Sequence, residues 1–418
     1  MTAVTEPQPR IATLDIVRGI AVMGILAMNI VAFAMPFQAY MNPVALGSAG
    51  ALDLASWVFS FVLVDGKMRG LFSFLFGASM LLVIEKAEAK GENAARIHFR
   101  RMGWLLVFGL LHLYLIWFGD ILTGYALVGM AAWFFHASST RALIRWAIAL
   151  LALQLLILAT MTLATFSLSA AAAAPGASAE TIAQWHAMAA SFDVLSGAAL
   201  TQKLAIYSGG YGGILADRVA LNAFTPISAL FLFGWETLAY FLLGMAALRT
   251  GFLRGDWSAA AYRRTALIGF GIGLPAYALL AALLIRDGFS VPMVFALAMA
   301  ATVPFRPLMV AAIAATIILA TRGRGPLVAR VAAAGRAAFT NYLGTSILMT
   351  TLFYGYGLGQ YGQLSRAELW LVVLPMWGLM LLWSKPWLDR FEYGPMEWLW
   401  RSLSRGGRQR MRKRAAVA

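Results

Sequence analysis

The residues best suited to chemistry in this sequence are a histidine and an aspartate that share one apolar stretch. His112 lies within GWLLVFGLLHLYLIWFGD, and Asp120 closes that stretch eight residues later. Histidine is the usual general base near neutral pH. An ideal helix places two such positions on roughly one side, about 12 Å apart along its axis. We therefore expect both residues at one catalytic site without a direct bond. The alternative is a buried histidine satisfied by a neighbouring carbonyl.

A second group of charges interrupts the apolar stretch 52–86, which contains Asp65-Gly66-Lys67-Met68-Arg69-Gly70. Charges at membrane depth are costly and usually face a cavity lined by protein or water. Irregular backbone is tolerated at that depth only in such places. We expect one long, kinked or broken element that brings Lys67 and Arg69 towards the outer-half cavity of His112. The alternative is a periplasmic turn between a short re-entrant helix and a normal span.

Further polar residues lie inside apolar stretches and are assigned to substrate binding. Glu236 and Arg306 are intramembrane charges, which are functional by default, although they could simply pair with each other. Asn29 needs a buried partner. Asn341 and Tyr342, in the sequence FTNY, are expected to line the route of the substrate.

The composition places these residues in a membrane protein. Of the 418 residues, 61% are hydrophobic and 12% are charged, whereas a soluble domain has about 25% charged residues. The absence of cysteine excludes disulfides, zinc ribbons and iron–sulfur clusters, and four histidines give no metal-ligand spacing. The sequence GLGQYG follows a membrane helix instead of a strand, so no dinucleotide site is expected.

The apolar stretches predict an all-α, polytopic bundle of ten membrane helices. Stretches of about 20 apolar residues are long enough to cross the hydrocarbon core. The expected helices are 13–35, 52–86, 100–118, 120–135, 141–168, 220–248, 264–285, 291–321, 334–354 and 367–384. Every second loop is basic, which predicts that both termini are cytoplasmic in a bacterial inner membrane. The net charge of +15 is thus mainly an orientation signal, and nucleic acid is not expected as a partner.

We expect a single transmembrane domain over residues 1–418, in four parts. Residues 10–168 form the N-terminal helices, 169–218 an extracytoplasmic segment with a surface helix, 219–384 the C-terminal helices, and 385–418 an interfacial helix and basic tail. The tail has six cations in residues 405–414, which suit anionic lipid, although an ordinary cytoplasmic tail has the same composition. Membrane lipids are thus expected partners, and a homodimer is left open.

Several segments together resemble the YeiB-like bacterial membrane proteins, which carry a C-terminal domain of unknown function. The matching segments are RIATLDIVRGIAVMGILAMNI (10–30), GKMRGLFSFLFGASM (66–80), RRMGWLLVFGLLHLYLIWFGDILTGYALVG (100–129), GRAAFTNYLGTSILMTTLFYGYGLGQYG (335–362) and FEYGPMEWLWR (391–401). That family is similar to the transmembrane acyltransferases, which include the lysosomal heparan glucosaminide N-acetyltransferase. The resemblance implies transfer of an acyl group from cytoplasmic acyl-CoA or acetyl-CoA to an acceptor on the far side.

The resemblance suggests roles for the predicted residues. Cations near the inner face would hold the phosphates of CoA: Arg18, Arg100, Arg101, Arg330 and Arg336. His112 would deprotonate the acceptor or carry the acyl group, and Lys67 or Arg69 would stabilise the oxyanion. The glucosaminide transferase has its catalytic histidine in the loop after its first span. Loop 36–50 of this chain has no histidine, so that assignment cannot be transferred.

Two other classes of function fit the same residues. The intramembrane charges suit a transporter or channel for a small metabolite, although no convincing internal repeat is found. A membrane scaffold without chemistry is the third interpretation. The sequence reveals neither the acceptor nor the length of the acyl chain.

Overall fold

The computed structural model describes residues 11–47, 49–190, 192–195, 197–323 and 325–413. Within these residues the secondary structure is helical, and the only strand-like pairing is an isolated bridge between Phe391 and Arg412. The all-α prediction is therefore confirmed. Position 10 of the predicted first part and positions 414–418 of the predicted tail lie outside the described residues.

Among the described residues, seven helical segments are long and apolar enough to cross a membrane. They are α1 (Ala12–Ala34), Ala51–Ala89, Ala94–Ile116, α7 (Thr140–Ala173), α11 (Thr225–Arg249), α12 (Ala259–Asp287) and α17 (Trp370–Arg390). Three further helical segments are apolar but shorter: Leu122–Phe135, Val291–Ala300 and Arg306–Ala320. The remaining predicted span, 334–354, contains α16 (Ala338–Phe353). A helical membrane bundle is confirmed, whereas the number of ten crossings stays a prediction.

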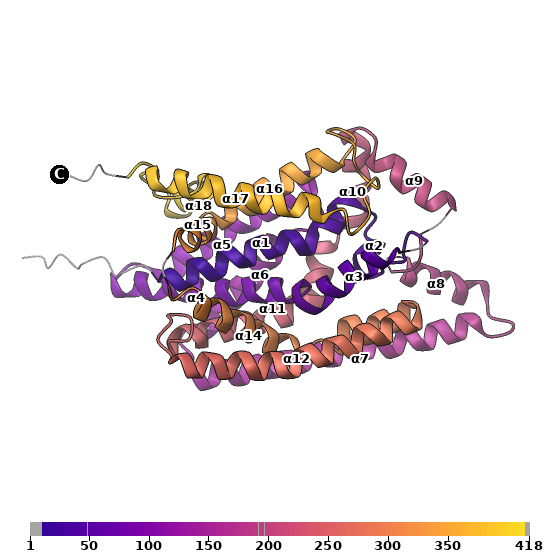
Figure 1. Cartoon of the computed structure of the whole chain (residues 1–418), viewed down its shortest axis with the longest axis horizontal. Coiled ribbons are helices and arrows are strands. Elements are labelled where there is room, and N and C mark those ends of the chain that lie inside the picture. Colours follow the sequence, from indigo (N-terminus) through magenta and orange to yellow (C-terminus); the bar gives the residue numbers. More distant parts are fainter. Residues whose placement is uncertain (1–10, 48, 191, 196, 324, 414–418) are drawn as a thin grey trace, which may run out of the picture.

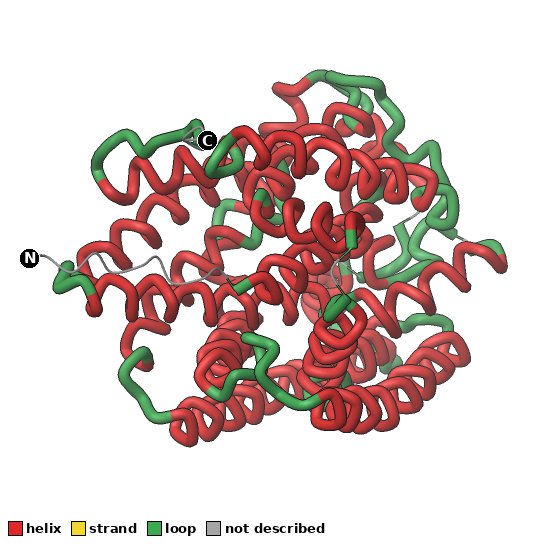
Figure 2. The backbone as a smooth tube through the Cα atoms, turned by 60° about the vertical axis from the view of Figure 1, so that its left-hand side comes forward, coloured by secondary structure: helices red, strands yellow, loops and turns green. Residues whose placement is uncertain are grey.

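Most helices run along the long axis of the molecule, with α1 in the middle (Figure 1). Helix α1 is buried along nearly its whole length, whereas α7 is largely exposed and forms one long side together with α12. Figure 2 shows the same bundle from another side, with helices predominating and connections of varied length between them. The centre of the bundle is therefore built around the first span.

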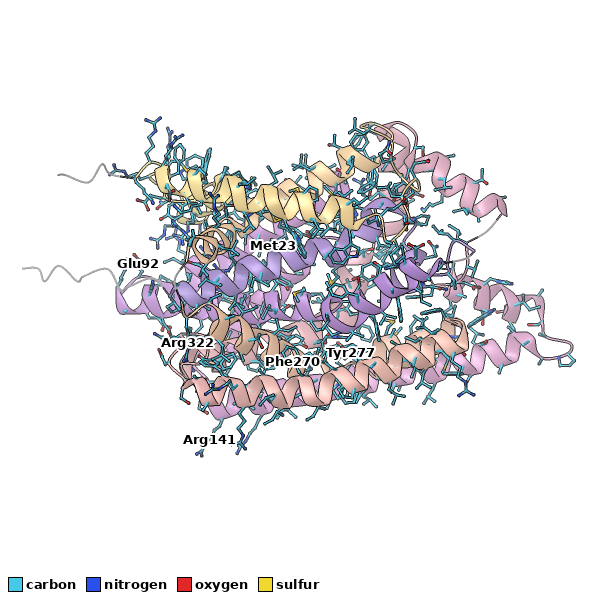
Figure 3. All side chains as sticks on the ribbon, in the orientation of Figure 1. Met23, Glu92, Arg141, Phe270, Tyr277 and Arg322 are labelled. Atoms are coloured by element: carbon cyan, nitrogen blue, oxygen red, sulfur yellow. The ribbon has the colours of Figure 1, made fainter. Side chains whose placement is uncertain are left out.

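The two ends of the bundle differ in their elements. Helices α15 (Pro326–Arg336) and α18 (Pro395–Arg405) lie at one end with the start of α1, and α8 (Ala179–Ala189), α9 (Gly197–Tyr207) and α10 (Tyr211–Asn222) lie at the other (Figure 1). Glu92, Arg141 and Arg322 all lie at the α15–α18 end, on the left of Figure 3. The predicted basic loops thus meet at one end.

The helix predicted on the outer membrane surface is present as α8, but its apolar side packs against protein. Trp185 and Phe192 join a cluster with Leu158 of α7 and Phe295, and the rings of Phe192 and Phe295 are 4.9 Å apart. Part of the surface that the sequence assigned to lipid is therefore covered by the bundle itself.

The second predicted span is broken, as its internal charges indicated. Helix α3 (Ala51–Phe59) continues into a π-helical turn, η1 (Ser60–Val64), and α4 begins again at Lys67 and ends at Ala89. Gly66 between them has a φ of +68°, and a Cβ there would lie 2.6 Å from Nε of Arg306. Only glycine satisfies both the backbone conformation and this close approach.

The predicted spans 291–321 and 100–118 are also irregular. In the first, α13 (Val291–Met293) and the π-helical η4 (Val294–Ala300) precede a turn, after which α14 (Arg306–Ala320) begins. In the second, α5 (Ala94–Leu111) ends in a further π-helical turn, η2 (His112–Ile116). Turns of this kind are rare and frequently occur at functional sites.

Helices α4 and α11 approach each other backbone to backbone. A Cβ on Gly77 would lie 2.1 Å from the carbonyl oxygen of Phe241, and a Cβ on Gly244 would lie 1.8 Å from that of Phe74. Small residues permit such close helix packing in membranes. This contact sets the distance between the two helices that carry Arg69 and Glu236.

We therefore expect Gly77→Ala to lower the free energy of unfolding by about 1–3 kcal/mol, because the new methyl group must push two backbones apart. Gly103→Ala is the matched control, since a Cβ on Gly103 meets nothing within 4 Å and alanine favours a helix. The measurement is denaturant unfolding of the full chain in detergent micelles. Equal stability of the two variants would contradict the proposed contact.

Candidate functional site

His112 and Asp120 are bonded directly. His112 Nδ1 lies 2.9 Å from Asp120 Oδ1. The expectation that spacing would keep them apart was wrong, because it assumed a regular helix. The helix ends at η2, Trp117 is extended with φ of −159°, and the chain then folds back towards His112. The end of the helix thus brings the carboxylate to the imidazole.

The carboxylate fixes the orientation of the imidazole. Asp120 Oδ2 accepts a hydrogen bond from the backbone N–H of Thr123 at 2.7 Å, at the start of α6 (Leu122–Ala132). Because an ionised carboxylate only accepts, this contact favours the tautomer in which Nδ1 of His112 donates, and in the neutral imidazole Nε2 then holds the free lone pair. His112 Nε2 is buried and has no hydrogen-bond partner among the described residues. A base of this form is ready to accept a proton.

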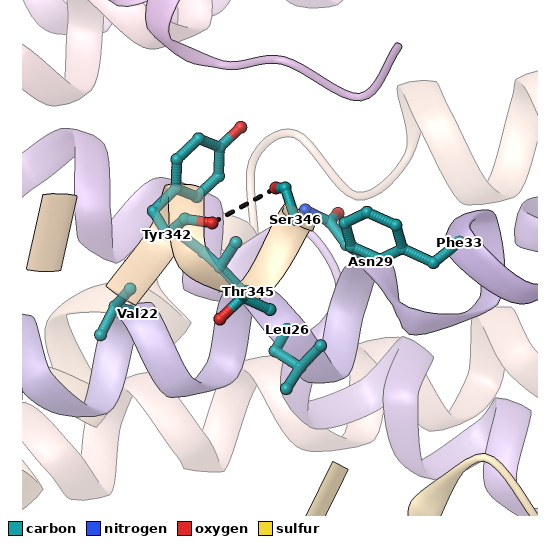
Figure 4. A pocket seen from close by; sticks show the side chains of 8 residues that line it. Val22, Leu26, Asn29, Phe33, Tyr342, Thr345 and Ser346 are labelled. Carbon is teal, nitrogen blue, oxygen red and sulfur yellow. Dashed lines mark hydrogen bonds between the residues drawn. The ribbon is translucent and has the colours of Figure 1, made fainter. Parts of the chain in front are cut away.

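A small cavity lies between α1 and α16, and Tyr342 in its lining connects it to this pair. It has a volume of about 10 Å³, the room of about one water molecule. Polar groups of Asn29, Tyr342, Thr345 and Ser346 line it together with apolar residues of α1 (Figure 4). The Tyr342 ring lies 5.2 Å from the His112 ring. Two predicted substrate-binding residues, Asn29 and Tyr342, therefore line one cavity, and Tyr342 also lies near the predicted base.

Tyr342 is held by the turn that carries Asp120. Its hydroxyl accepts from the backbone N–H of Ile121 at 3.2 Å and lies 3.4 Å from the carbonyl oxygen of Gly119. The position of the tyrosine is thus coupled to the position of the carboxylate.

Glu236 is the centre of a separate charged cluster. One carboxylate oxygen accepts from Arg69 at 2.6 Å, and the other accepts from Arg306. Arg306 also donates to the hydroxyl of Thr302 at 2.6 Å. The pairing of Glu236 with Arg306, which the sequence left as one alternative, is confirmed, and Arg69 is a third member. The cluster joins α4, α11 and α14.

Lys67 and Asp65 lie at the break between α3 and α4. The fully buried Lys67 donates to the carbonyl of Phe61 in η1, and its ammonium lies 3.2 Å from the centre of the Tyr277 ring. Asp65 accepts from the Tyr40 hydroxyl at 2.7 Å. No hydrogen bond or ion pair in the described part of the chain joins Lys67 or Arg69 to His112 or Asp120. The structure thus brings these predicted catalytic residues into two places.

The arginines predicted for CoA lie at the α15–α18 end in two groups. Arg18 donates to Ser79 at 2.6 Å and to Asp15, and α1 packs against α15 near it. The carbonyl of Leu381 accepts from Arg330, and that of Glu392 accepts from Arg336.

The second group contacts α18. Arg100 donates to the carbonyl of Leu403 at 3.2 Å, and the Arg101 guanidinium lies 4.2 Å from the centre of the Trp400 ring. The five arginines therefore share one end of the bundle, and each also supports the packing of helices there.

Asn341 does not join Tyr342 at the cavity. Its amide donates to the carbonyl of Ala334 and to the Ser384 hydroxyl, and it accepts from the Trp383 indole at 2.8 Å. These contacts tie α16 to α15 and α17. Neighbouring positions on a helix point in different directions, which explains why the two residues separate.

Sequence reasoning missed two residues that support these sites. The backbone of Thr123 holds Asp120, and the Gln154 side chain accepts from the backbone N–H of Glu236 at 3.3 Å and donates to Leu232. The signal for Gln154 was available, because a lone glutamine in the apolar run LLALQLLILA needs a buried partner. Thr123 acts through its backbone, which leaves no trace in its side-chain type.

Comparisons with known proteins give a family without a known activity. Residues 247–407 match the family model described as a protein of unknown function (DUF418). The chain is 33% identical to the uncharacterized protein YeiB of Escherichia coli, over 94% of this chain and 96% of that protein. It is 30% identical to the uncharacterized protein YxaH of Bacillus subtilis, over 96% and 95% of the two chains. No solved structure matches the chain.

We expect Glu236→Gln to lower the free energy of unfolding by about 3–5 kcal/mol, because it leaves two buried guanidinium groups without their shared counter-charge. The control is Asp389→Asn, which breaks an exposed ion pair with Lys385 and should change stability little. Denaturant unfolding in micelles measures both. A Glu236→Gln variant as stable as the wild type would show that the cluster does not hold the three helices together.

Proposed function

We propose that this chain, which belongs to the family of YeiB-like bacterial membrane proteins, is a membrane-bound acyltransferase with His112 as its general base. The observation that supports the proposal most is the buried His112–Asp120 pair. Its Nε2 has no partner in the described part of the chain, and Tyr342, whose ring lies 5.2 Å from the His112 ring, also lines a small cavity. A histidine oriented by a carboxylate, with its second nitrogen available, is the arrangement used to activate hydroxyl nucleophiles.

The proposed reaction transfers an acyl group from a thioester. His112 Nε2 removes the proton from a hydroxyl or amine of the acceptor as this group attacks the carbonyl carbon of acyl-CoA. The new bond to the acceptor forms, the bond from carbon to sulfur breaks, and the thiolate of CoA takes the proton from the imidazolium. Asp120 stabilises the imidazolium while it exists. Acetyl-CoA or a longer acyl-CoA is the proposed donor substrate.

The proposed orientation places the α15–α18 end in the cytoplasm of a bacterial inner membrane. The basic loops and the described part of the tail lie at that end, which fits the excess of cations on the cytoplasmic side. Anionic lipid is the proposed partner of the tail. Arg18, Arg100, Arg101, Arg330 and Arg336 would face the phosphates of CoA there. The acceptor would then approach from the α8–α10 end.

A second candidate function is transport of a small metabolite. The broken second span and the broken span before α14 meet at Gly66 and Arg306, beside Glu236. Broken helices with charged residues at membrane depth are typical of transporter sites. Lys67 and Arg69 belong to this place instead of the His112 pair, so they favour transport more than oxyanion stabilisation.

Release of free thiol from acetyl-CoA and longer acyl-CoA by the purified chain in proteoliposomes tests the first proposal, with a lipid extract of the bacterial envelope as acceptor. We expect His112→Gln and Asp120→Asn each to lower turnover at least about 100-fold, because general-base catalysis contributes that much or more. His186→Gln is the matched control and should leave turnover unchanged, because His186 is an exposed residue of α8, which packs against α7.

Turnover that persists in His112→Gln would exclude this residue as the base. A wild-type protein that consumes no acyl-CoA but moves a labelled metabolite across the vesicle membrane would replace the transferase proposal with the transporter.

A further inference from the structure

Arg218 of α10 is a buried cation with unused donors. The residue is 0% exposed, and its Nη1 donates to the carbonyl oxygen of Tyr114 at 3.3 Å. Its Nε and Nη2 have no acceptor within the described residues. A buried guanidinium normally has its N–H groups paired, because leaving them unpaired costs free energy. An unpaired one is therefore a feature that needs an explanation.

The acid next to Arg218 in the sequence does not pair with it. Asp217 accepts from Lys203 with both carboxylate oxygens, at 3.0 and 2.8 Å. No ion pair of Arg218 occurs among the described residues. The charge of Arg218 thus has no counter-ion in direct contact within the part of the chain that the structure describes.

Two further donors in the same region are also unused. Trp117 Nε1 and Tyr354 Oη are buried and have no partner in the described ranges. The Tyr354 ring lies 5.1 Å from the ring of Tyr207, which ends α9, and α9 packs against α10. Trp117 follows the turn η2 that Arg218 contacts. Trp117 and Tyr354 belong to one cluster of buried side chains, which also contains Tyr207 and Tyr361. A guanidinium, an indole and a phenol therefore offer N–H and O–H groups without an acceptor.

This group of donors adjoins the proposed catalytic pair. The ring of Trp117 lies 6.3 Å from the ring of His112, and α10 packs on η2, which begins with His112. The Tyr211 hydroxyl, also on α10, donates to the carbonyl of Leu115 in the same turn at 2.8 Å. Helix α10 thus covers the turn that carries the base, at the end of the bundle opposite the five inner arginines (Figure 1).

We propose that Arg218, Trp117 and Tyr354 form a binding site for an oxyanion of the acceptor substrate, either a carboxylate or a phosphate. The planar fork of a guanidinium matches the oxygens of both groups. That the bound molecule is the acceptor rests on the proposed acyltransferase function. A molecule held by its anionic group at Arg218 has its hydroxyl or amine close to His112, which makes this site the determinant of acceptor specificity.

Anion binding by the full-length protein tests the site without any need for turnover. Titration with inorganic phosphate or succinate in neutral detergent, followed by the midpoint of thermal unfolding, measures a soluble oxyanion. Nanodiscs with phosphatidylglycerol, compared with nanodiscs of phosphatidylcholine alone, measure a lipid phosphate. We expect at least one oxyanion to raise the midpoint of the wild type in a saturable manner, beyond chloride at equal ionic strength.

The variants separate the donors. We expect Arg218→Gln to weaken binding at least about tenfold, because a charge-assisted hydrogen bond is lost, and Tyr354→Phe to weaken it about fivefold. Arg286→Gln is the matched control, since Arg286 is an exposed cation at the C-terminal end of α12 and should bind like the wild type. Tyr354→Phe keeps the packing of the ring. If Arg218→Gln does not fold, the oxyanion affinity of Tyr354→Phe relative to the wild type tests the site instead.

Each outcome has one meaning. Stabilisation by phosphate or succinate supports a soluble acceptor. Stabilisation by phosphatidylglycerol alone, if Arg218→Gln abolishes it, supports a lipid acceptor, whereas an effect that Arg218→Gln retains belongs to the basic tail. Absence of stabilisation of the wild type by every oxyanion, or equal binding by the wild type, Arg218→Gln and Tyr354→Phe, overturns the site. Oxyanion binding by a wild-type protein that consumes no acyl-CoA would remove the transferase proposal and leave the anion site intact.

Discussion

The ion pairs of Glu236 with Arg69 and Arg306 are the constraint on which the middle of the structure depends. A lone carboxylate in a low-dielectric interior is very costly, so Glu236 fixes both cations at its own depth. Arg306 opens α14 and Arg69 lies in the first turn of α4. The depth of Glu236 on α11 thus sets where α4 and α14 begin, and each of these two helices begins after a break in its span. The close approach at Gly77 and Gly244 keeps α4 near enough for this pairing.

The irregular turns are the second common element, and they occur both near the charged cluster and at the histidine. The π-helical turns η1, η2 and η4 each lie in a segment predicted as a regular span. At η1 the change of pitch places the carbonyl of Phe61 in reach of Lys67. At η2 it ends a helix early, so that Asp120 returns to His112. In both places the irregularity gives a polar side chain a partner that a straight helix would have kept away.

The sequence predicted those elements whose position follows from hydrophobicity or from the need to compensate buried charges. Ten apolar stretches coincide with helical segments, and charges within 52–86 correctly indicated a broken span. The pairing of Glu236 and Arg306 could be predicted because buried charges must be compensated.

The bond from His112 to Asp120 could not be predicted from the sequence, because the spacing of the two residues along an ideal helix excludes it. Asn341 could not be separated from Tyr342 by pattern alone. Arg218 gave no signal, because an arginine outside the spans is expected in water and only the packing of α10 buries it.

The arginines at the two ends of the bundle show how the same residue type serves different needs. Those at the α15–α18 end bind carbonyls of the chain or stack on a ring, so they hold helices together. Arg218 is buried more deeply and retains two nitrogens without an acceptor in the described chain. A fully buried guanidinium is tolerated at such a cost only where something else offsets it, and a substrate oxyanion is the simplest compensation. Because α10 contacts the turn that begins with His112, that compensation would occur next to the base, and anion binding and proton transfer would share one segment of backbone.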